Sequence, residues 1–590
     1  MKTRRTNTAR LPAFGRNPLE VVRAALVAGC LSVFGGCGPP SDIDTPTKTA
    51  AVRSDDSGSR PAPKTFSFTD LGAPIGGTPT EAVLPRYIPE AKGGGAALFD
   101  HDGDGRLDLL IAKGSTVARA ARAEPGFGAA LYLGTGDGRF RDASVEAGLD
   151  VPLPWLMAPV AADFDGDGRT DVLFTALEGL RYFRNEGGRF VDRTATALPV
   201  AAAESGWCTS AVAADFDGDD DLDVFVARYL VFDPKAPPED GVGGRTCRHR
   251  DRPVLCGPRG LRPLGDLLLK NRGDGTFEEA GLAAGLTAVA PAYGLGAVVL
   301  DFDRDGRPDV YVANDATPNH LWRNEGGRFV EVAAGLGVAW SADGAPEAGM
   351  GVDAADLNGD GIEDLVVTNF ETEPNDVYLS HGGLGWIESS ARVRTAGVDR
   401  PFVGWGVGIR DFDGDGRLDM FVANGHVYHG FTEGSAFAEP CILHLGRADL
   451  TFARFRGPGA SALDTPRPSR AAAFGDIDDD GDVDVVVAGV GVPPAILRAE
   501  VPADLDWFGL RVRGQGRNLA ALGAAVEFDD GGRVRHATVR AQSSFQSTSD
   551  PRLLFRSAKG GRPPVFRVRQ SGRSAAITAV AGAYVDLVLR

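Results

Sequence analysis

A nine-residue motif that recurs along the chain constrains its fold more than any other feature. The motif reads D-x-D-x-D-G-x-x-D in the copy from Asp411 to Asp419. Carboxylates at alternate positions converge only if the backbone curls around a point between them. Gly416, at the sixth position, permits this turn because glycine has no Cβ atom. Such a group of like charges repels itself, so the motif predicts a hard cation bound at its centre.

Copies of the motif divide most of the chain into repeating units. The intervals between successive copies range from 52 to 86 residues. Repeats at this spacing indicate a propeller, a solenoid or an array, in which each unit buries its faces against its neighbours. The seven copies begin at Asp100, Asp163, Asp215, Asp301, Asp356, Asp411 and Asp476.

The residues around each loop predict strands. The first half of the motif is similar to an EF-hand loop, whose ligands at positions 1, 3, 5 and 7 suit Ca²⁺. An EF-hand loop has Glu at position 12 and lies between helices, whereas the twelfth residue of this copy is Val422. The apolar residues 407–409 and 420–423 flank the loop as strands would. Each unit therefore begins as strand, loop, strand.

A second hairpin completes each unit. In the first unit, residues 131–133 and 140–142 read as strands joined by a Gly-rich turn. Two hairpins make a four-stranded sheet, and seven such sheets around an axis make a seven-bladed β-propeller. A linear solenoid is the alternative, although its repeats are usually shorter and need distinct caps. The predicted fold is all-β, with the propeller over residues 64–502.

The last unit lacks a fourth strand, because residues 505–507 already begin a different pattern. Residues 65–71 precede the first unit and are similar to the fourth strand at 139–143. We predict that this N-terminal strand pairs with residues 495–498 and closes the last blade. The pairing would remove the sheet edge that an open array exposes.

The N-terminus has the pattern of an export signal. A basic lead is followed by 13 apolar or small residues, 24–36, which are too few for a membrane span of about 20 residues. The stretch is similar to a bacterial lipoprotein signal sequence, in which the cysteine after the small residues is lipidated. We predict a signal peptide over residues 1–37 with Cys37 lipidated, Cys30 being the alternative, and a disordered linker over residues 38–63. The protein is then exported and anchored at the bacterial cell envelope, at the outer membrane or cell surface, or is secreted.

The repeats resemble the FG-GAP or VCBS repeats of integrin α-subunit propellers and their bacterial relatives. The resemblance implies that the first, third, fifth and ninth side chains and the seventh carbonyl of each loop bind Ca²⁺, up to seven ions in all. The implied metal ligands are Asp100, Asp102, Asp104, Arg106 and Asp108; Asp163, Asp165, Asp167, Arg169 and Asp171; Asp215, Asp217, Asp219, Asp221 and Asp223; Asp301, Asp303, Asp305, Arg307 and Asp309; Asp356, Asn358, Asp360, Ile362 and Asp364; Asp411, Asp413, Asp415, Arg417 and Asp419; and Asp476, Asp478, Asp480, Asp482 and Asp484.

Two copies depart from this pattern. The third has Asp220 where glycine is expected, which weakens rather than excludes binding, since Asp tolerates left-handed backbone conformations better than most residues. The fifth has Asn358 at the third position, which keeps an oxygen ligand with less charge.

The long interval between the third and fourth copies holds an Arg-rich insertion, residues 229–263. We predict a disulfide between Cys247 and Cys256, in an oxidising compartment. The insertion either contacts a partner or is only a surface loop closed by the disulfide. The sequence leaves open whether Cys208 and Cys441 pair or remain buried thiols. His426 and His429 lie three residues apart, and we interpret them as ordinary loop content rather than as metal ligands.

Residues 503–590 change character. Alternating strands there predict a compact β-sandwich-like module. Residues 501–590 contain 14 Lys and Arg against 7 Asp and Glu, so this part is basic while the whole chain has a formal charge of −18. The module either docks on the acidic propeller or faces an anionic polymer or surface. Residues 507–512, 522–526 and 543–553 resemble the ASPIC/UnbV domain of the cartilage acidic protein family.

These features predict a surface-anchored, calcium-binding adhesion or recognition module for a protein or glycan. The acidic composition argues against nucleic-acid binding. We expect a monomer that touches the membrane only through its lipid anchor. No GxSxG, HExxH or phosphate-binding glycine motif occurs, so we assign no catalytic residue and predict that the protein is not an enzyme. The alternatives are a propeller lyase or hydrolase acting on glycans, and a scaffold subunit of a cell-envelope assembly.

Overall fold

The computed structural model describes residues 66–73, 85–238, 247–249, 251–428, 437–502 and 505–589. The chain divides into two units, residues 1–56 and 57–590, and all described residues belong to the second. The predicted signal peptide, Cys30, Cys37 and the linker lie outside the described residues.

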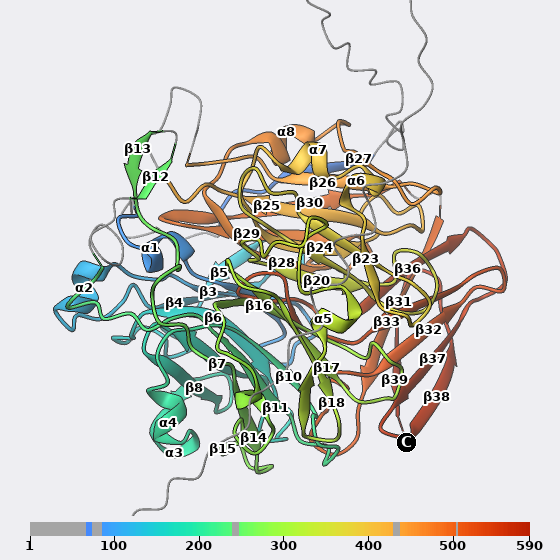
Figure 1. Cartoon of the computed structure of the whole chain (residues 1–590). Helices are drawn as coiled ribbons and strands as arrows, with labels where there is room; N and C mark the ends of the chain where they lie inside the picture. Colours follow the sequence, from blue (N-terminus) through green and yellow to red (C-terminus); the bar gives the residue numbers. More distant parts are fainter. Residues whose placement is uncertain are drawn as a thin grey trace, which may run out of the picture. The chain divides into compact units, whose positions relative to one another are not determined.

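Seven sheets of the described chain share one plan, in which four strands lie side by side and each runs antiparallel to its neighbours (Figure 1). The motif loop joins the first strand to the second, and these sheets are called repeat sheets below. They contain β2 (Ala96–Phe99), β3 (Asp108–Ala112), β4 (Ala129–Gly134) and β5 (Phe140–Asp142); β6 (Leu156–Ala162), β7 (Asp171–Ala176), β8 (Gly179–Asn185) and β9 (Phe190–Asp192); β10 (Cys208–Ala214), β11 (Asp223–Arg228), β14 (Leu267–Asn271) and β15 (Phe277–Glu279); β16 (Gly294–Leu300), β17 (Asp309–Asn314), β18 (His320–Asn324) and β19 (Phe329–Glu331); β20 (Val352–Ala355), β21 (Asp364–Val367), β22 (Asp376–Ser380) and β23 (Trp386–Glu388); β24 (Gly404–Arg410), β25 (Asp419–Asn424), β26 (Ile442–Gly446) and β27 (Phe452–Arg454); and β28 (Ser469–Gly475), β29 (Asp484–Gly489), β30 (Val492–Glu500) and β1 (Ser67–Asp70).

The N-terminal strand completes the last repeat sheet, as the sequence predicted. β1 runs antiparallel to β30, with Ser67 opposite Glu500 and Asp70 opposite Leu497. The pairing covers the outer edge of β30, which would otherwise expose unpaired backbone groups.

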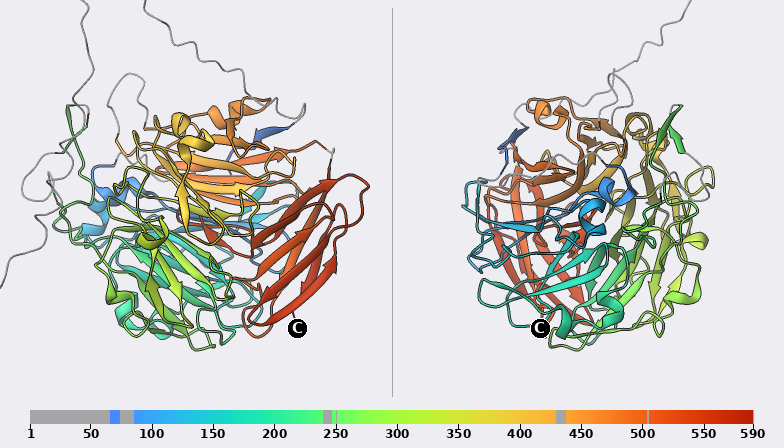
Figure 2. Two further views of the ribbon diagram at one scale, coloured as in Figure 1. Left: turned by 45° about the vertical axis from the view of Figure 1, so that its right-hand side comes forward. Right: turned by 90° about the vertical axis from the view of Figure 1, so that its left-hand side faces the viewer.

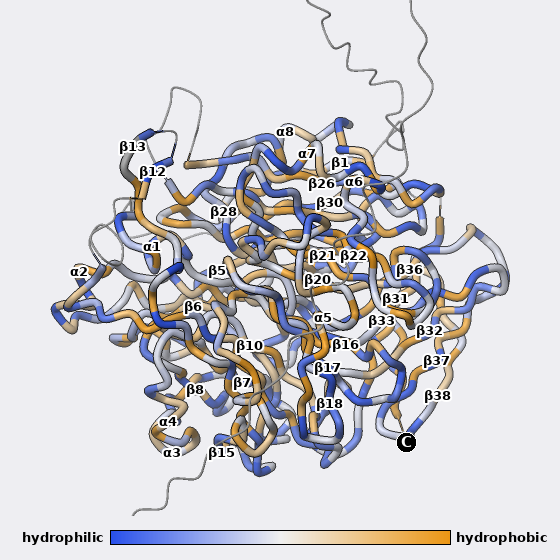
Figure 3. Tube along the Cα trace, viewed as in Figure 1, coloured by the Kyte–Doolittle hydropathy of each residue, from blue (hydrophilic) through white to orange (hydrophobic). Residues whose placement is uncertain are grey.

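The first strands of the repeat sheets contact one another in chain order, and β28 contacts β2, so the contacts close a ring. Small residues allow this approach. A Cβ atom on Gly351 would lie 2.0 Å from the Trp405 carbonyl oxygen of the next sheet. Hydrophobic residues lie along the strands, and hydrophilic residues lie in the loops at their ends (Figure 3). The core is therefore made by sheets packed face to face around the ring.

The C-terminal strands form a separate pair of sheets, called the C-terminal module (residues 505–589), beside the repeat sheets (Figure 2). Their inner faces share one core, in which the rings of Phe528 and Phe555 stack with centroids 4.7 Å apart. One sheet orders β36 (Leu553–Ala558), β31 (Leu505–Arg513) and β39 (Tyr584–Val588), and the other β33 (Val534–Thr538), β32 (Ala525–Asp529), β37 (Val565–Gln570) and β38 (Arg573–Thr578).

Helices are a minor part of the described chain. Each has four or five residues, and none has the length and apolar character of a membrane-spanning segment. They are α1 (Ile88–Lys92), α2 (Val117–Ala121), α3 (Thr194–Ala197), α4 (Val200–Ala203), α5 (Ala333–Leu336), α6 (Ser390–Val393), α7 (Ala396–Asp399) and α8 (Ala460–Asp464).

One segment of the C-terminal module enters the ring of first strands. This central segment, residues 541–550, contains the short strands β34 (Gln542–Ser543) and β35 (Ser547–Thr548), and β35 pairs in parallel with β2. The Phe545 side chain is fully buried against Trp405, with ring centroids 4.9 Å apart. The module and the ring therefore share one interior.

Polar atoms of the central segment satisfy backbone groups of the first strands. Gln542 accepts the Ala213 N–H and donates to the Ala161 carbonyl. The Ser544 hydroxyl accepts the Val407 N–H at 2.9 Å, and the Ser549 hydroxyl accepts the Phe474 N–H at 3.1 Å. First strands near a propeller axis leave such groups without a sheet partner, so the segment supplies partners that water would otherwise provide.

Candidate functional site

The motif loops bring carboxylates together as predicted for positions one, three and nine. In at least four of the loops, one oxygen of each of these three side chains lies within 4.8 Å of the other two. These groups are Asp100, Asp102 and Asp108; Asp163, Asp165 and Asp171; Asp215, Asp217 and Asp223; and Asp301, Asp303 and Asp309.

The loops have oxygen atoms suited to a hard cation. One carboxylate oxygen of each of Asp217, Asp411 and Asp478 is buried and has no hydrogen-bond partner. A buried carboxylate oxygen without a partner is costly, and a coordinated ion would satisfy it. An all-oxygen ligand set fits Ca²⁺.

The first aspartate of the loop accepts hydrogen bonds from the backbone that curls around it. The two oxygens of Asp100 accept the N–H groups of Gly103 at 2.8 Å and Gly105 at 3.0 Å. Gly105 has a φ of 90°, in the left-handed region. In the third copy, Asp220 replaces this glycine and has a φ of 69°, so it adopts the predicted left-handed conformation.

The ninth aspartate ties the loop to the third strand of its sheet. Asp419 accepts the Phe412 N–H at 3.0 Å and the Gly446 N–H at 2.8 Å. Burial raises the pKa of the corresponding Asp108 to about 7 and of Asp223 to about 8. A cation beside these carboxylates would favour their charged form and oppose this rise.

The fifth aspartate has a different partner. In four loops its carboxylate forms an ion pair with the arginine at position seven of the same loop, whose carbonyl the family resemblance implies as a ligand. The pairs are Asp104 with Arg106, Asp167 with Arg169, Asp305 with Arg307, and Asp415 with Arg417. In the first, second and fourth loops the structure therefore groups positions one, three and nine and directs the fifth carboxylate to arginine.

Basic side chains of the C-terminal module cover several motif loops. Arg573 forms a bidentate ion pair with Asp220 of the third loop, at 2.6 and 2.7 Å. On the seventh loop, Arg552 bonds Asp479 at 2.7 Å and the Tyr584 hydroxyl donates to Asp476 at 3.0 Å. The structure thus places the basic module against the acidic loops, which is the first of the two arrangements that its charge allowed.

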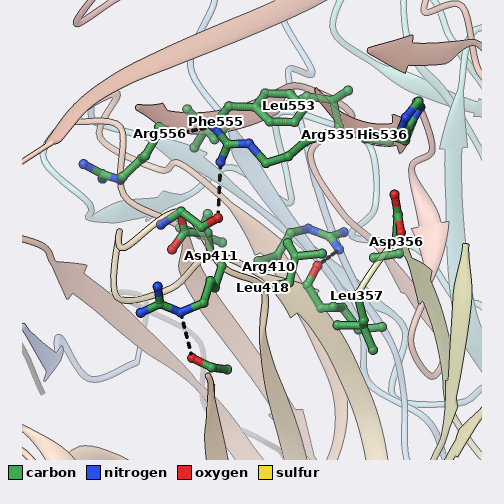
Figure 4. Close-up of a pocket in the computed structure, with 18 of the residues that line it drawn as sticks. Asp356, Leu357, Arg410, Asp411, Leu418, Arg535, His536, Leu553, Phe555 and Arg556 are labelled. Carbon is green, nitrogen blue, oxygen red and sulfur yellow. Dashed lines mark hydrogen bonds between the residues drawn. The ribbon is translucent and has the colours of Figure 1, made fainter. Parts of the chain in front are cut away.

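A cavity of about 190 Å³ lies where the module meets the fifth, sixth and seventh loops. In Figure 4, Leu357 and Leu418 of the loops lie on one side and Leu553 and Phe555 of the module on the other. Arg535 reaches across and donates to the Gly416 carbonyl at 3.5 Å. This cavity belongs to the contact between the loops and the module.

The other end of the repeat sheets carries the connections from second to third strands. Because the second strand runs away from the motif loop, its last residue lies at the opposite end of the sheet. These two ends are called the loop end and the opposite end. The predicted disulfide between Cys247 and Cys256 is present there, across the hairpin of β12 (Cys247–His249) and β13 (Arg252–Val254). Cys208 and Cys441 are buried free thiols.

A buried polar cluster gathers at the opposite end. His249 of the hairpin lies beside Glu371, which follows β21, and His426, which follows β25. Burial lowers the pKa of His426. Nearby, Lys92 of α1 forms an ion pair with Asp315, which follows β17, at 3.6 Å. The sequence pattern placed His426 only beside His429 and gave no link to His249 or Glu371. His429 lies outside the described residues.

The sequence does contain one signal for this cluster, which is the position of its residues within the repeats. Asp315, Glu371 and His426 occupy equivalent places, one to four residues after the second strand of successive sheets. Polar residues at matching positions of successive repeats lie at the same end of their sheets, and this is the sequence signal for a shared location. His249 has no equivalent, because it lies in the insertion.

Five segments of the chain match the FG-GAP-like repeat, and four of them begin at a motif loop. The matched residues are 100–174, 163–226, 261–312, 301–367 and 356–422.

The chain is 26% identical over 375 residues to cartilage acidic protein 1 of Mus musculus, covering 59% of this chain and 51% of the mouse protein. It is 25% identical over 411 residues to cartilage acidic protein 1 of Xenopus tropicalis, covering 65% of this chain and 58% of that protein. The chain thus spans about half the length of the curated relatives it matches.

Two solved structures are similar in part. A lectin of Agrocybe aegerita that recognises non-reducing terminal N-acetylglucosamine matches with a TM-score of 0.36 and 16% identity, over 69% of this chain and 90% of the lectin. A rhamnogalacturonan lyase of Bacillus licheniformis matches with a TM-score of 0.36 and 12% identity, over 73% of this chain and 75% of the lyase. These scores are too low to support a functional comparison.

The repeat matches and the curated relatives agree with the molecule described above. Tandem matches run from one motif loop through the next, and the relatives carry the name of the family that the C-terminal module resembles. The chain is an FG-GAP-repeat protein that is similar over part of its length to cartilage acidic protein 1.

Proposed function

We propose that the repeat sheets are the blades of a seven-bladed propeller with a C-terminal sandwich-like module, and that the protein is an exported, lipid-anchored recognition module. Up to seven Ca²⁺ ions bind in the motif loops and stabilise the blades. The partner is a protein or a glycan.

This proposal is supported by a difference between the two ends of the repeat sheets: the C-terminal module covers one end, and the insertion is exposed at the other. The module's basic side chains contact the loop end, and the central segment fills the ring. The opposite end carries the disulfide-stapled insertion, on which Arg248 and Arg259 are exposed. The partner therefore binds at the opposite end, and the calcium loops act on stability rather than on contact.

The test is a binding screen of the chain without its signal peptide against glycan and protein libraries in millimolar Ca²⁺. For a partner so found, the double variant Arg248→Gln, Arg259→Gln should weaken binding. Arg272→Gln, an exposed arginine beyond the end of β14, is the matched control and should leave binding unchanged.

Binding that is lost in the control and kept in the double variant would place the partner at the loop end and contradict the proposal. Cleavage of a bound glycan would replace it by the enzyme hypothesis, because a recognition module leaves its ligand intact.

A further inference from the structure

Three side chains that can each ligate a metal converge at the opposite end, apart from the motif loops. His249 Nε2 lies 2.8 Å from Glu371 Oε1, and His426 Nε2 lies 3.3 Å from Glu371 Oε2. One ligand atom from each residue lies within 4.8 Å of the other two. Spacings of this size are those of donor atoms that share one metal ion.

We propose that His249, Glu371 and His426 bind a divalent transition metal ion, for which Zn²⁺ is the best fit. Two imidazole nitrogens and one carboxylate form a ligand set that Zn²⁺ accepts readily, with a fourth position left for water or a ligand. The motif loops offer only oxygen atoms and suit Ca²⁺ instead. The protein would then hold two chemically different classes of metal site at its two ends.

The fold builds this cluster from three separate connections. Glu371 and His426 come from neighbouring repeat sheets, and the insertion brings His249 to them from the third. The disulfide begins at Cys247, two residues before His249, and so holds the hairpin that carries this ligand. Side-chain exposure is 17% for His249, 6% for Glu371 and 7% for His426, so the donors are shielded from bulk water.

The charges around the cluster have both signs, and Arg470 is the cation that acts against a second positive charge at His426. Lys92 is already paired with Asp315 at 3.6 Å. Arg470 donates to the carbonyl oxygens of Gly425 and His426, at 2.9 and 3.1 Å. Glu439 is close enough to Glu371 for the two carboxylates to repel each other. A metal ion would reduce this repulsion.

The hydrogen bonds define the change that metal binding requires. The Tyr428 N–H donates to His426 Nδ1 at 3.0 Å, so the proton of the neutral ring is on Nε2 and faces Glu371. A metal can take the Nε2 lone pair only after this nitrogen has given its proton to solvent and Nδ1 has taken one up. A protonated Nδ1 no longer accepts the Tyr428 N–H, so metal binding requires the loss of this hydrogen bond.

The test is a titration of the chain with Zn²⁺ alone as the probe, in millimolar Ca²⁺ so that the motif loops do not compete. We expect one Zn²⁺ per chain. Glu371→Gln and His249→Gln should each weaken binding by at least about tenfold, because each removes a ligand, and loss of a residue that only hydrogen-bonds a metal ligand already costs about 10–100-fold. His381→Gln, an exposed histidine beyond β22, is the control and should bind as the parent does.

The absence of stoichiometric Zn²⁺ binding would overturn the proposal, and would mean that Glu371 only hydrogen-bonds the two imidazoles. Zn²⁺ binding that both ligand variants retain would also overturn it. If a variant fails to fold, the visible absorption spectrum of the parent chain with bound Co²⁺ tests the site instead. Intense visible bands of a four- or five-coordinate ion with nitrogen ligands support the site, and the weak bands of an octahedral all-oxygen ion overturn it.

Discussion

The two ends of the repeat sheets are made from the same strands but are organised by different means. At the loop end, each connection is a short motif that folds on its own aspartates, and the C-terminal module covers several copies. At the opposite end, connections of unequal length bring single residues from different sheets together. Regular local sequence therefore builds one end, and long-range packing builds the other. Four predictions test this difference.

The largest effect is expected from calcium removal. EDTA should lower the melting temperature substantially, because an ion bound only to the folded chain stabilises it by about 2.7 kcal/mol per site at a hundredfold excess over its dissociation constant. Hydrogen exchange should rise first in the motif loops and at the contacts of the module. An unchanged melting curve in EDTA would show that the motif loops contribute to stability without a bound ion. The proposed difference between the two ends would then be wrong.

The next largest effect is expected at the central segment, which joins the ring to the module. Phe545→Ala removes a fully buried ring that packs on Trp405 and should cost about 3–5 kcal/mol of unfolding free energy, measured by denaturant titration. Val534→Ala on β33 is a suitable control, because Val534 is 40% exposed and its loss should change stability by less than about 0.5 kcal/mol. Equal effects of the two variants would mean that the module docks only through its surface.

Loss of a single loop should cost less than chelation. Asp411→Ala removes one first-position ligand while the other loops keep theirs, so the expected loss is at most about 2.7 kcal/mol. Asp100→Ala removes the same ligand from the first loop. Asp411 interacts electrostatically with Arg535 and Arg556 of the module, so only its variant should increase hydrogen exchange in β33 and β36. Equal hydrogen exchange in β33 and β36 of both variants would show that the stability of the module does not depend on an ion in the sixth loop.

The smallest net effect is expected from pH. Burial raises the pKa of Asp171 to about 7 and of Asp309 to about 8, against about 3.9 in an unfolded chain. In EDTA the folded state then holds more protons, so its unfolding free energy should fall as pH rises from about 4 to about 8. Carboxylates whose pKa is lowered, such as Asp220, oppose this trend. Saturating Ca²⁺ should abolish the fall, and a calorimetric pH series in both conditions measures it.

The sequence predicted the features that repeat or that depend on near neighbours. The motif loops, the strand order, the closing pair of β1 and β30, and the disulfide of the insertion all follow from local pattern and composition. The charge of the C-terminal module predicted its docking on the loops only as one of two alternatives, because charge does not identify a partner.

Other features could not be predicted from local sequence. Nothing in residues 541–550 indicates that they enter a ring formed by strands hundreds of positions earlier, since a polar Ser- and Gln-rich stretch reads as a loop. The pairing of the fifth aspartate with the arginine two residues later depends on side-chain conformation in the folded loop. The cluster of His249, Glu371 and His426 depends on three connections whose relative positions only the fold determines.

The strand that closes the last repeat sheet has a consequence for the order of folding. Ser67 is among the first described residues, and its partner Glu500 is among the last residues before the C-terminal module. Each earlier sheet can form as soon as its own hairpins leave the ribosome. The ring cannot close until nearly the whole chain has emerged, and contacts between such distant residues form slowly. During that interval β30 offers an unpaired edge to other chains. Protection of this edge until β1 returns is therefore the step at which folding of the chain is most exposed to misassembly.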